Sequence, residues 1–108
     1  MAEYSSQLKL IRDIAEKEKI AFKKHCILRM YERGIRADEV KEVLASGEII
    51  ELYTEDKPLP SCLLLGYTSK NRNIHVVVAV DKDEPMLWVI TVYLPTTEEW
   101  DEEFRMRK

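Results

Sequence analysis

The chain has 108 residues, of which 45% are hydrophobic and 34% are charged, and its formal net charge at pH 7 is −3. This length and composition are those of one globular domain with a core of its own, and they argue against several domains. The net negative charge argues against a general polyanion-binding protein.

The expected location follows from what the sequence lacks. No apolar run approaches the ~20 residues that span a bilayer, and the first residues do not show the basic and then apolar pattern of a secretion signal. We therefore expect a cytoplasmic protein without membrane association. Cys26 and Cys62 each lie in an apolar stretch and form no Cys-x-x-Cys motif, so we expect buried free thiols rather than a disulfide.

Charge is distributed unevenly along the chain. Residues 17–36 hold seven Lys and Arg against two Glu, a local charge of +5, whereas residues 48–108 hold seven basic and twelve acidic residues, a charge of −5. Two interpretations stay open: an anionic ligand at the basic segment, or an ordinary solvated helix face.

The N-terminal half shows helical spacing. The first predicted helix begins at Ser5 or Ser6 and runs to about residue 19, the second covers 22–33 and ends at Gly34, and the third begins near 37–38 and ends at Gly47. In the second helix, Ile27, Met30 and Tyr31 are expected to face inward. The opposite side carries three basic side chains at i, i+4 and i+8, namely His25, Arg29 and Arg33.

The pattern then changes to strands. Four β-rich runs, 48–54, 62–69, 74–81 and 86–94, are joined by short links that cannot hold crossover helices, which predicts an antiparallel meander. After Pro95, Thr96 or Thr97 is expected to cap a short helix through Phe104, docked by Trp100 within the acidic segment 98–103. The predicted fold is therefore α+β: N-terminal helices, a four-stranded antiparallel meander and a short C-terminal helix, as one domain over residues 1–108.

Strand alternation assigns side chains to the two sheet faces. The third run is expected to bury Ile74, Val76, Val78 and Val80 and to turn His75, Val77 and Ala79 the other way. The fourth run is expected to separate Thr91 and Tyr93 from Trp88, Ile90 and Val92. Pairing of these runs then predicts that His75, Thr91 and Tyr93 share one face, away from a core that contains Ile90.

A His near a Tyr and arginines suits the cleavage of RNA without a metal. That reaction needs a base, an acid and positive charge on the phosphorane-like transition state. The alternative is that each of these side chains is structural. His25, Cys26, Cys62 and His75 are the soft ligands available, and their spacing matches no known metal site. There is also no Gly-rich phosphate loop, so we expect neither a metal nor another cofactor.

A resemblance supports the same chemistry. The segment from His25 to Ile35, the pattern Val40-x-x-Val43-Leu44-x-x-Gly47-Glu48 and the segment from Val89 to Pro95 resemble a prokaryotic domain-of-unknown-function family, number 4258. The resemblance covers about residues 22–105, with residues 1–21 as an N-terminal extension.

That family is similar to the RelE, BrnT and MqsR toxins, small ribonucleases of toxin–antitoxin pairs. The resemblance implies a RelE-like α+β fold, RNA or the ribosome as a target, and a zinc-finger antitoxin as a partner. The catalytic residues it implies are His75, Arg33, Arg29 and Tyr93. The residues expected to bind RNA are His25, Lys23, Lys24 and Arg36.

Two functions therefore remain as hypotheses. The first is a toxin-type, metal-independent endoribonuclease in which His75 is the general acid or base. The second is a non-catalytic interaction module, an inactive toxin relative that binds an acidic, antitoxin-like partner over residues 17–36.

Overall fold

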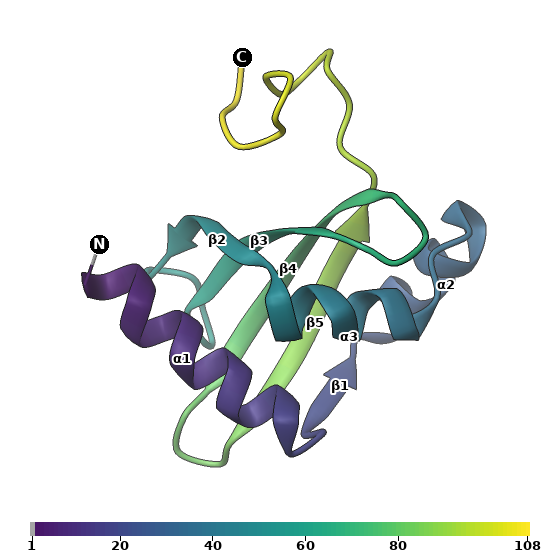
Figure 1. The fold of residues 1–108 in the computed structure, drawn as a ribbon. Helices are drawn as coiled ribbons and strands as arrows, with labels where there is room; N and C mark the ends of the chain where they lie inside the picture. The colour runs from purple at the N-terminus through teal and green to yellow at the C-terminus, as the bar shows by residue number, and fades with distance from the viewer. Residues whose placement is uncertain (1) are drawn as a thin grey trace.

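A computed structural model describes residues 2–108, and Met1 lies outside it. The elements follow in chain order: α1 (Ala2–Glu16), β1 (Ile20–Phe22), α2 (Lys24–Arg33), α3 (Ala37–Ser46), β2 (Glu48–Tyr53), β3 (Ser61–Tyr67), β4 (Asn73–Asp81) and β5 (Met86–Tyr93). Figure 1 shows α1 and α3 on one face of the sheet and the C-terminal segment beyond the other face. The α+β class is confirmed.

The sheet has five strands in the order β1-β5-β4-β3-β2, and it is mixed. The four predicted strands form the expected antiparallel meander, but β1 adds a parallel edge by pairing Ile20–Phe22 with Leu87–Val89 of β5. The sequence did not predict β1 because three residues are too few to show alternation, and they fell between two helical patterns. The prediction of a purely four-stranded antiparallel sheet is therefore wrong.

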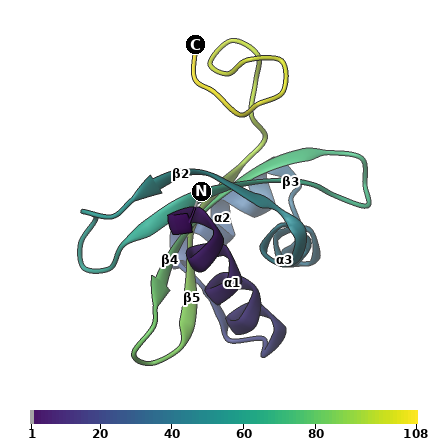
Figure 2. The ribbon, with the colours of Figure 1, turned by 60° about the vertical axis from the view of Figure 1, so that its left-hand side comes forward.

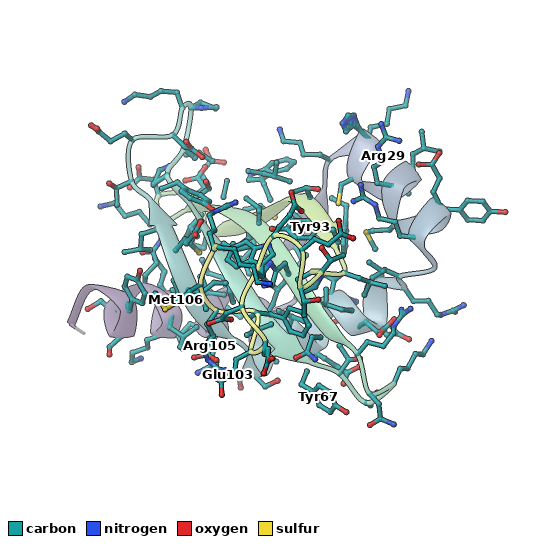
Figure 3. All side chains as sticks on the ribbon, turned by 90° about the horizontal axis from the view of Figure 1, so that it is seen from above. Arg29, Tyr67, Tyr93, Glu103, Arg105 and Met106 are labelled. Carbon is teal, nitrogen blue, oxygen red and sulfur yellow. The ribbon has the colours of Figure 1, made fainter. Side chains whose placement is uncertain are left out.

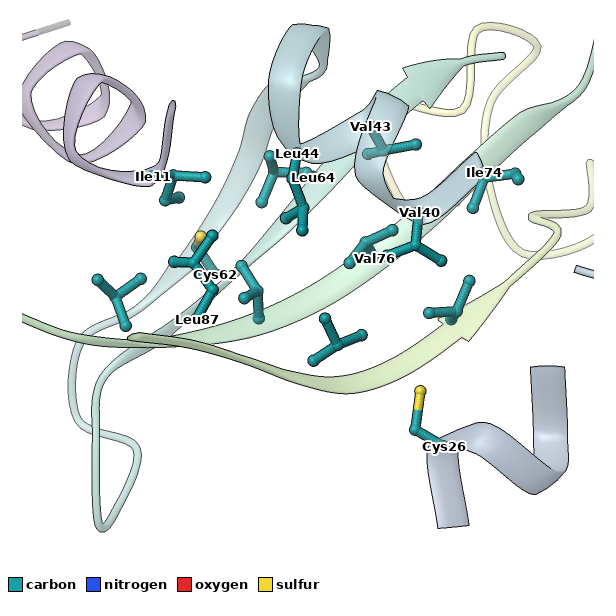
Figure 4. Packing of buried hydrophobic residues seen from close by; sticks show 14 of the residues in the cluster. Ile11, Cys26, Val40, Val43, Leu44, Cys62, Leu64, Ile74, Val76 and Leu87 are labelled. Atoms are coloured by element: carbon teal, nitrogen blue, oxygen red, sulfur yellow. The ribbon is translucent and has the colours of Figure 1, made fainter. Parts of the chain in front are cut away.

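The core lies between the sheet and the helices α1 and α3. Ile11 from α1 and Val40 and Leu44 from α3 are fully buried against β-strand side chains such as Val76 (Figure 4). Gly34 ends α2 with φ 66°, a left-handed conformation that glycine adopts without a Cβ penalty. No helix among residues 2–108 is long and apolar enough to cross a membrane.

The predicted inward face of α2 is partly wrong. Cys26 and Met30 are the buried residues of this helix, whereas Ile27 is 55% and Tyr31 is 85% exposed. The physical reason is position: α2 lies at the β5 side of the sheet, so a single edge of this ten-residue helix reaches the core.

The predicted C-terminal helix does not form. Phe104 has φ 61°, and the Asp101 carboxylate accepts hydrogen bonds from the backbone N–H groups of Glu103 and Arg105 (3.2 and 3.0 Å). These local bonds compete with a helical ladder and hold residues 101–106 as turns. A bridge between Trp100 and Arg107 closes the segment. We call residues 95–108 the tail; Figure 2 shows it on the sheet face opposite α1 and α3, which we call the outer face.

A β-bulge changes the side-chain assignment in β5. The register shifts between Val77 and Val78, so Val78 pairs with Val89 and leaves Ile90 without a partner. Because of the extra residue, Leu87, Val89 and Val92 belong to the core cluster. Trp88 and Ile90 instead line a hollow with Lys23 and the loop after β2. The prediction that Trp88 and Ile90 share the face of Val92, with Ile90 in the core, is wrong.

Candidate functional site

The outer face brings His75 and Tyr93 together, as alternation predicts. The two residues stand directly opposite each other on β4 and β5. The Tyr93 hydroxyl lies 3.2 Å from His75 Nδ1, and His75 Nε2 lies 2.8 Å from the carbonyl oxygen of Phe104 in the tail. Figure 3 shows the tail crossing the sheet, with Tyr93 beside it.

These two hydrogen bonds determine the tautomer of His75. A carbonyl oxygen can only accept, so Nε2 carries the proton, and in the neutral ring Nδ1 then accepts from the Tyr93 hydroxyl. Burial lowers the pKa of His75, an effect that the Phe104 carbonyl partly offsets, and burial raises the pKa of Tyr93. Both groups are therefore held neutral at pH 7.

The tail seals His75 from solvent. Trp100 is 2% exposed and packs edge-to-face on the imidazole, with 4.5 Å between ring centroids. The guanidinium of Arg107 lies 4.6 Å from the Trp100 ring centroid, and its Nε and Nη2 donate to Glu51 of β2 at 3.0 and 3.2 Å. As a result, the exposed fraction of His75 is 0%.

A surface hollow lies directly beside this pair. Its volume is about 370 Å³, and its walls are Arg33, Tyr93, Leu94, Glu99, Trp100 and Arg107. Arg33 reaches it from the end of α2, where its Nη1 donates to the Val92 carbonyl at 2.7 Å. Arg107 contacts Glu51 through Nε and Nη2, which leaves its Nη1 outside that pair. The hollow thus combines two guanidinium groups, one carboxylate and one phenol.

The other predicted site residues lie elsewhere. Arg29 is exposed and pairs with Glu32 at 3.0 Å. Lys24 and His25 line a different hollow on α2, and Lys23 lies over Trp88. Arg36 is an exposed residue at the N-terminus of α3. The four predicted RNA-binding residues therefore do not line the hollow at Tyr93.

Arg107 and Trp100 are the residues that sequence reasoning missed at this hollow. Trp100 was expected to dock the tail, which it does, but nothing local indicated that it docks on His75. The sequence did contain a long-range signal. Arg105 and Arg107 follow the acidic segment 98–103, and their positive charge complements the negative charge of Glu48 and Glu51 in β2. In the structure Arg105 pairs with Glu48 at 2.6 Å, beside the Arg107–Glu51 pair.

A different surface feature occurs on α2. Ile27, Leu28 and Tyr31 are 55%, 56% and 85% exposed and lie on one helical face at spacings i, i+1 and i+4. Together with Lys24 and His25 they line a shallow hollow of about 730 Å³. We call Ile27, Leu28 and Tyr31 the α2 strip. Large apolar side chains that gather on a surface mark an interaction site more often than scattered ones do.

The residues that could hold a metal are not gathered. Among residues 4–108, whose side chains the structure describes, no group of three or more His, Cys, Asp or Glu side chains is arranged around a common point. Cys26 and Cys62 are free and buried. Burial raises the pKa of both thiols, that of Cys62 to about 12, so they remain protonated at pH 7.

Comparison with known protein families gives a match over most of the chain. The sequence profile of a family described as a domain of unknown function, DUF4258, matches residues 22–94. That range includes α2, α3 and all four strands of the meander, but only Phe22 of β1 and none of α1 or of the tail. No curated protein and no solved structure matches the chain significantly.

Proposed function

Because the chain belongs to the DUF4258 family, whose description carries no activity, we propose from the site itself that it is a metal-independent endoribonuclease related to the toxins of toxin–antitoxin systems. One observation carries the proposal: the Tyr93 hydroxyl, hydrogen-bonded to His75, lines the same hollow as Arg33 and Arg107. The hollow therefore places a proton path beside two guanidinium groups, whose N–H groups outside the bonds to Val92 and Glu51 can bind phosphate.

The proposed reaction uses the 2′-hydroxyl of RNA as the nucleophile. As this hydroxyl attacks the adjacent phosphorus, its proton passes to the Tyr93 oxygen while the Tyr93 proton passes to His75 Nδ1. Arg33 and Arg107 stabilise the charge on the phosphorane. The bond to the 5′-oxygen then breaks and that oxygen takes a proton from solvent, while His75 returns its extra proton to solvent through Tyr93. The products are a 2′,3′-cyclic phosphate and a 5′-hydroxyl.

This mechanism changes the role expected for His75. Its ring is fully buried, so it acts through Tyr93 rather than on RNA. Burial and the charge of Arg107 lower the pKa of His75, and the Phe104 carbonyl and the carboxylate of Glu51 oppose them, so these two acceptors support the imidazolium that forms in the reaction. Arg29, which pairs with Glu32 on the surface of α2, has no place in the reaction.

The test is cleavage of RNA with EDTA present, with and without ribosomes, and analysis of the product ends. Tyr93→Phe should lower cleavage by roughly 10²- to 10⁴-fold, because it removes the proton path and keeps the ring. Tyr67→Phe is the matched control, since Tyr67 is 62% exposed at the end of β3. Intact RNA after incubation with the unaltered protein, under both conditions, would refute the proposal.

A second function is favoured by the α2 strip. We propose that, without any catalysis, the strip binds an amphipathic helix with acidic flanks, such as a segment of a zinc-finger antitoxin. The apolar side chains of the strip are exposed, and Lys24 and His25 border them. Burial of each such side chain contributes up to ~1.5–3 kcal/mol, and acidic flanks complement the basic segment 17–36.

This second function is tested by isolating the protein from its native host. A partner in stoichiometric amount with an acid-flanked amphipathic helix should bind the unaltered chain and not the Leu28→Glu, Tyr31→Glu variant. Tyr67→Glu is the control, because it places the same charge at an exposed tyrosine outside the strip. Equal binding by both variants would exclude the strip as the interface.

A further inference from the structure

Trp88 occupies an unusual position for a tryptophan. The bulge at Ile90 turns it to the outer face, where its partly exposed ring forms a wall between two hollows of about 290 and 490 Å³. The smaller hollow is mainly apolar, with Pro58, Leu59, Ala79 and Ile90 around the ring. Its volume is close to the lower limit of pockets that bind small molecules, so it admits a single ring system.

Lysines surround the Trp88 ring. Lys23 Nζ lies 5.1 Å from the ring centroid, Lys57 borders the smaller hollow, and Lys17 and Lys19 border the larger one. None of the four pairs with a carboxylate among residues 4–108, whose side chains the structure describes. One unpaired lysine over the ring and three more around its two hollows stand out in a chain whose net charge is −3.

Three carboxylates also border these hollows, and two of them are used locally. Asp56 accepts a hydrogen bond from the Ser61 hydroxyl at 2.5 Å. Asp81 accepts from the backbone N–H groups of Asp83 and Glu84, both at 3.1 Å, in the turn between β4 and β5. Glu84 is the third. Four lysines against these three carboxylates leave a formal charge of +1 around Trp88, and the hydrogen bonds hold two of the carboxylates away from the lysines.

The Trp88 ring, with lysines nearby, has the features of a binding site for single-stranded nucleic acid. Proteins that bind single-stranded nucleic acids stack bases on aromatic side chains and hold the backbone with nearby lysines and arginines. We propose that Trp88 is the stacking platform for one base of single-stranded RNA, with the flanking phosphates held by Lys17, Lys19, Lys23 and Lys57.

The position of Trp88 relative to Tyr93 agrees with this ligand. Trp88 stands opposite Ala79 and Tyr93 opposite His75 on the same face of β4 and β5. Along β4, where the strand is unbroken, their partners Ala79 and His75 are four residues apart, about 13 Å at ~3.3 Å per residue. One extended strand of RNA can therefore reach both positions. The assignment of RNA as a substrate rests on the proposed function, whereas the binding itself is measured without cleavage.

The binding experiment uses an oligonucleotide of eight 2′-O-methyl uridines, which has no 2′-hydroxyl to attack and so cannot be cleaved. Its addition at low salt should quench tryptophan fluorescence in a saturable way. Trp88→Ala should weaken binding by roughly 5- to 150-fold, and Tyr67→Ala should leave the affinity unchanged. Removal of Lys17 and Lys19 together should reduce the slope of log K against log salt by roughly 1.4. Lys9→Ala, which alters a paired lysine on α1, should not.

Three results would overturn the inference. They are no quenching, equal affinity of Trp88→Ala and the unaltered protein, and equal affinity for a polyglutamate peptide, which would show a general cation patch. Failure of the proposed function looks different: RNA then stays intact while Trp88-dependent binding persists. Conversely, if RNA is cleaved and Trp88→Ala does not change the KM, Trp88 is not a stacking platform, and the ribonuclease proposal is unaffected.

Discussion

At the scale of single residues, His75 is a neutral imidazole whose two nitrogens are both bonded, in a site without solvent access. Burial lowers its pKa below the ordinary value of 6.5, which the unfolded chain keeps. Below that pH the unfolded state binds a proton that the folded state does not. The stability that belongs to neutral His75 is therefore complete above pH 6.5 and is lost as pH falls through the folded pKa.

We expect the free energy of unfolding, measured with urea, to decrease between pH 7 and pH 5. In His75→Gln this decrease should become clearly smaller, although the variant is less stable at pH 7 because the amide cannot reproduce both hydrogen bonds. His25→Gln changes an exposed imidazole and is the control. Identical pH slopes in all three proteins would contradict the burial of a neutral His75.

The sequence predicted residue positions well where a strand is regular. Alternation along β4 correctly separated His75 from Ile74 and Val76, because period 2 holds in an unbroken strand. Alternation failed at Trp88 and Ile90 because the bulge inserts one residue there, and no local sequence pattern indicates a bulge. It also could not reveal that His75 is sealed, since the covering residues are 25 or more positions away in the sequence.

At the scale of elements, α3 is fixed to the β3–β4 turn by a buried ion pair. Glu39 is 1% exposed and accepts from Arg72 Nε at 3.0 Å and from the Thr68 hydroxyl at 2.9 Å. Arg72 Nη2 also donates to Glu39 and, at 2.7 Å, to the Gly34 carbonyl at the end of α2. The hydrogen bond from Arg72 is the largest cause of the lowered pKa of Glu39.

Breaking this pair should be costly. Glu39→Ala leaves Arg72 without its partner, and we expect a loss of about 3–5 kcal/mol in the free energy of unfolding. Asp13→Ala, which breaks the exposed Lys9–Asp13 pair, should change it by about 0.5 kcal/mol or less. Replacement of both Glu39 and Arg72 by apolar residues should recover much of the loss. A cost for Glu39→Ala no larger than for Asp13→Ala would show that the pair is not an anchor.

Close packing between α3 and β3 gives a third prediction. A Cβ on Gly66 would lie 2.7 Å from Val43 Cγ2, a distance that forces the side chain or the strand to move. Gly66→Ala should therefore lower the free energy of unfolding by about 1–3 kcal/mol. Val43→Ala alone should also destabilise by leaving a cavity. The two changes together should cost less than the sum of the single costs, as a double-mutant cycle measures; strict additivity would contradict the contact.

At the scale of the whole molecule, the acidic residues of β2 are paired with arginines, whereas the lysines around Trp88 are not paired with carboxylates among residues 4–108. The acidic positions Glu48 and Glu51 of β2 pair with Arg105 and Arg107, so the tail neutralises this part of the acidic half. The lysines around Trp88 have no such partners among residues 4–108. The net charge of −3 therefore conceals a basic outer-face site, and an overall charge alone is a poor guide to which ligands a small domain accepts.

Packing of the tail on the outer face creates a second buried cluster, which contains Trp100 and His75. Trp100→Ala removes a side chain that is 2% exposed, and we expect a loss of about 3–5 kcal/mol in the free energy of unfolding. It should also let water reach His75, so the pKa of His75, measured by NMR titration, should rise toward 6.5. Met106→Ala is the control, because Met106 belongs to the same tail and is 69% exposed.

These two measurements separate a structural tail from a loosely attached one. If the tail is part of the fold, Trp100→Ala should lose much of its stability and shift the titration of His75. Met106→Ala should show neither change. If Trp100→Ala changed neither quantity, the tail would not cover His75 in solution. In that case His75 would be accessible to RNA directly, and the proton path would no longer have to run through Tyr93.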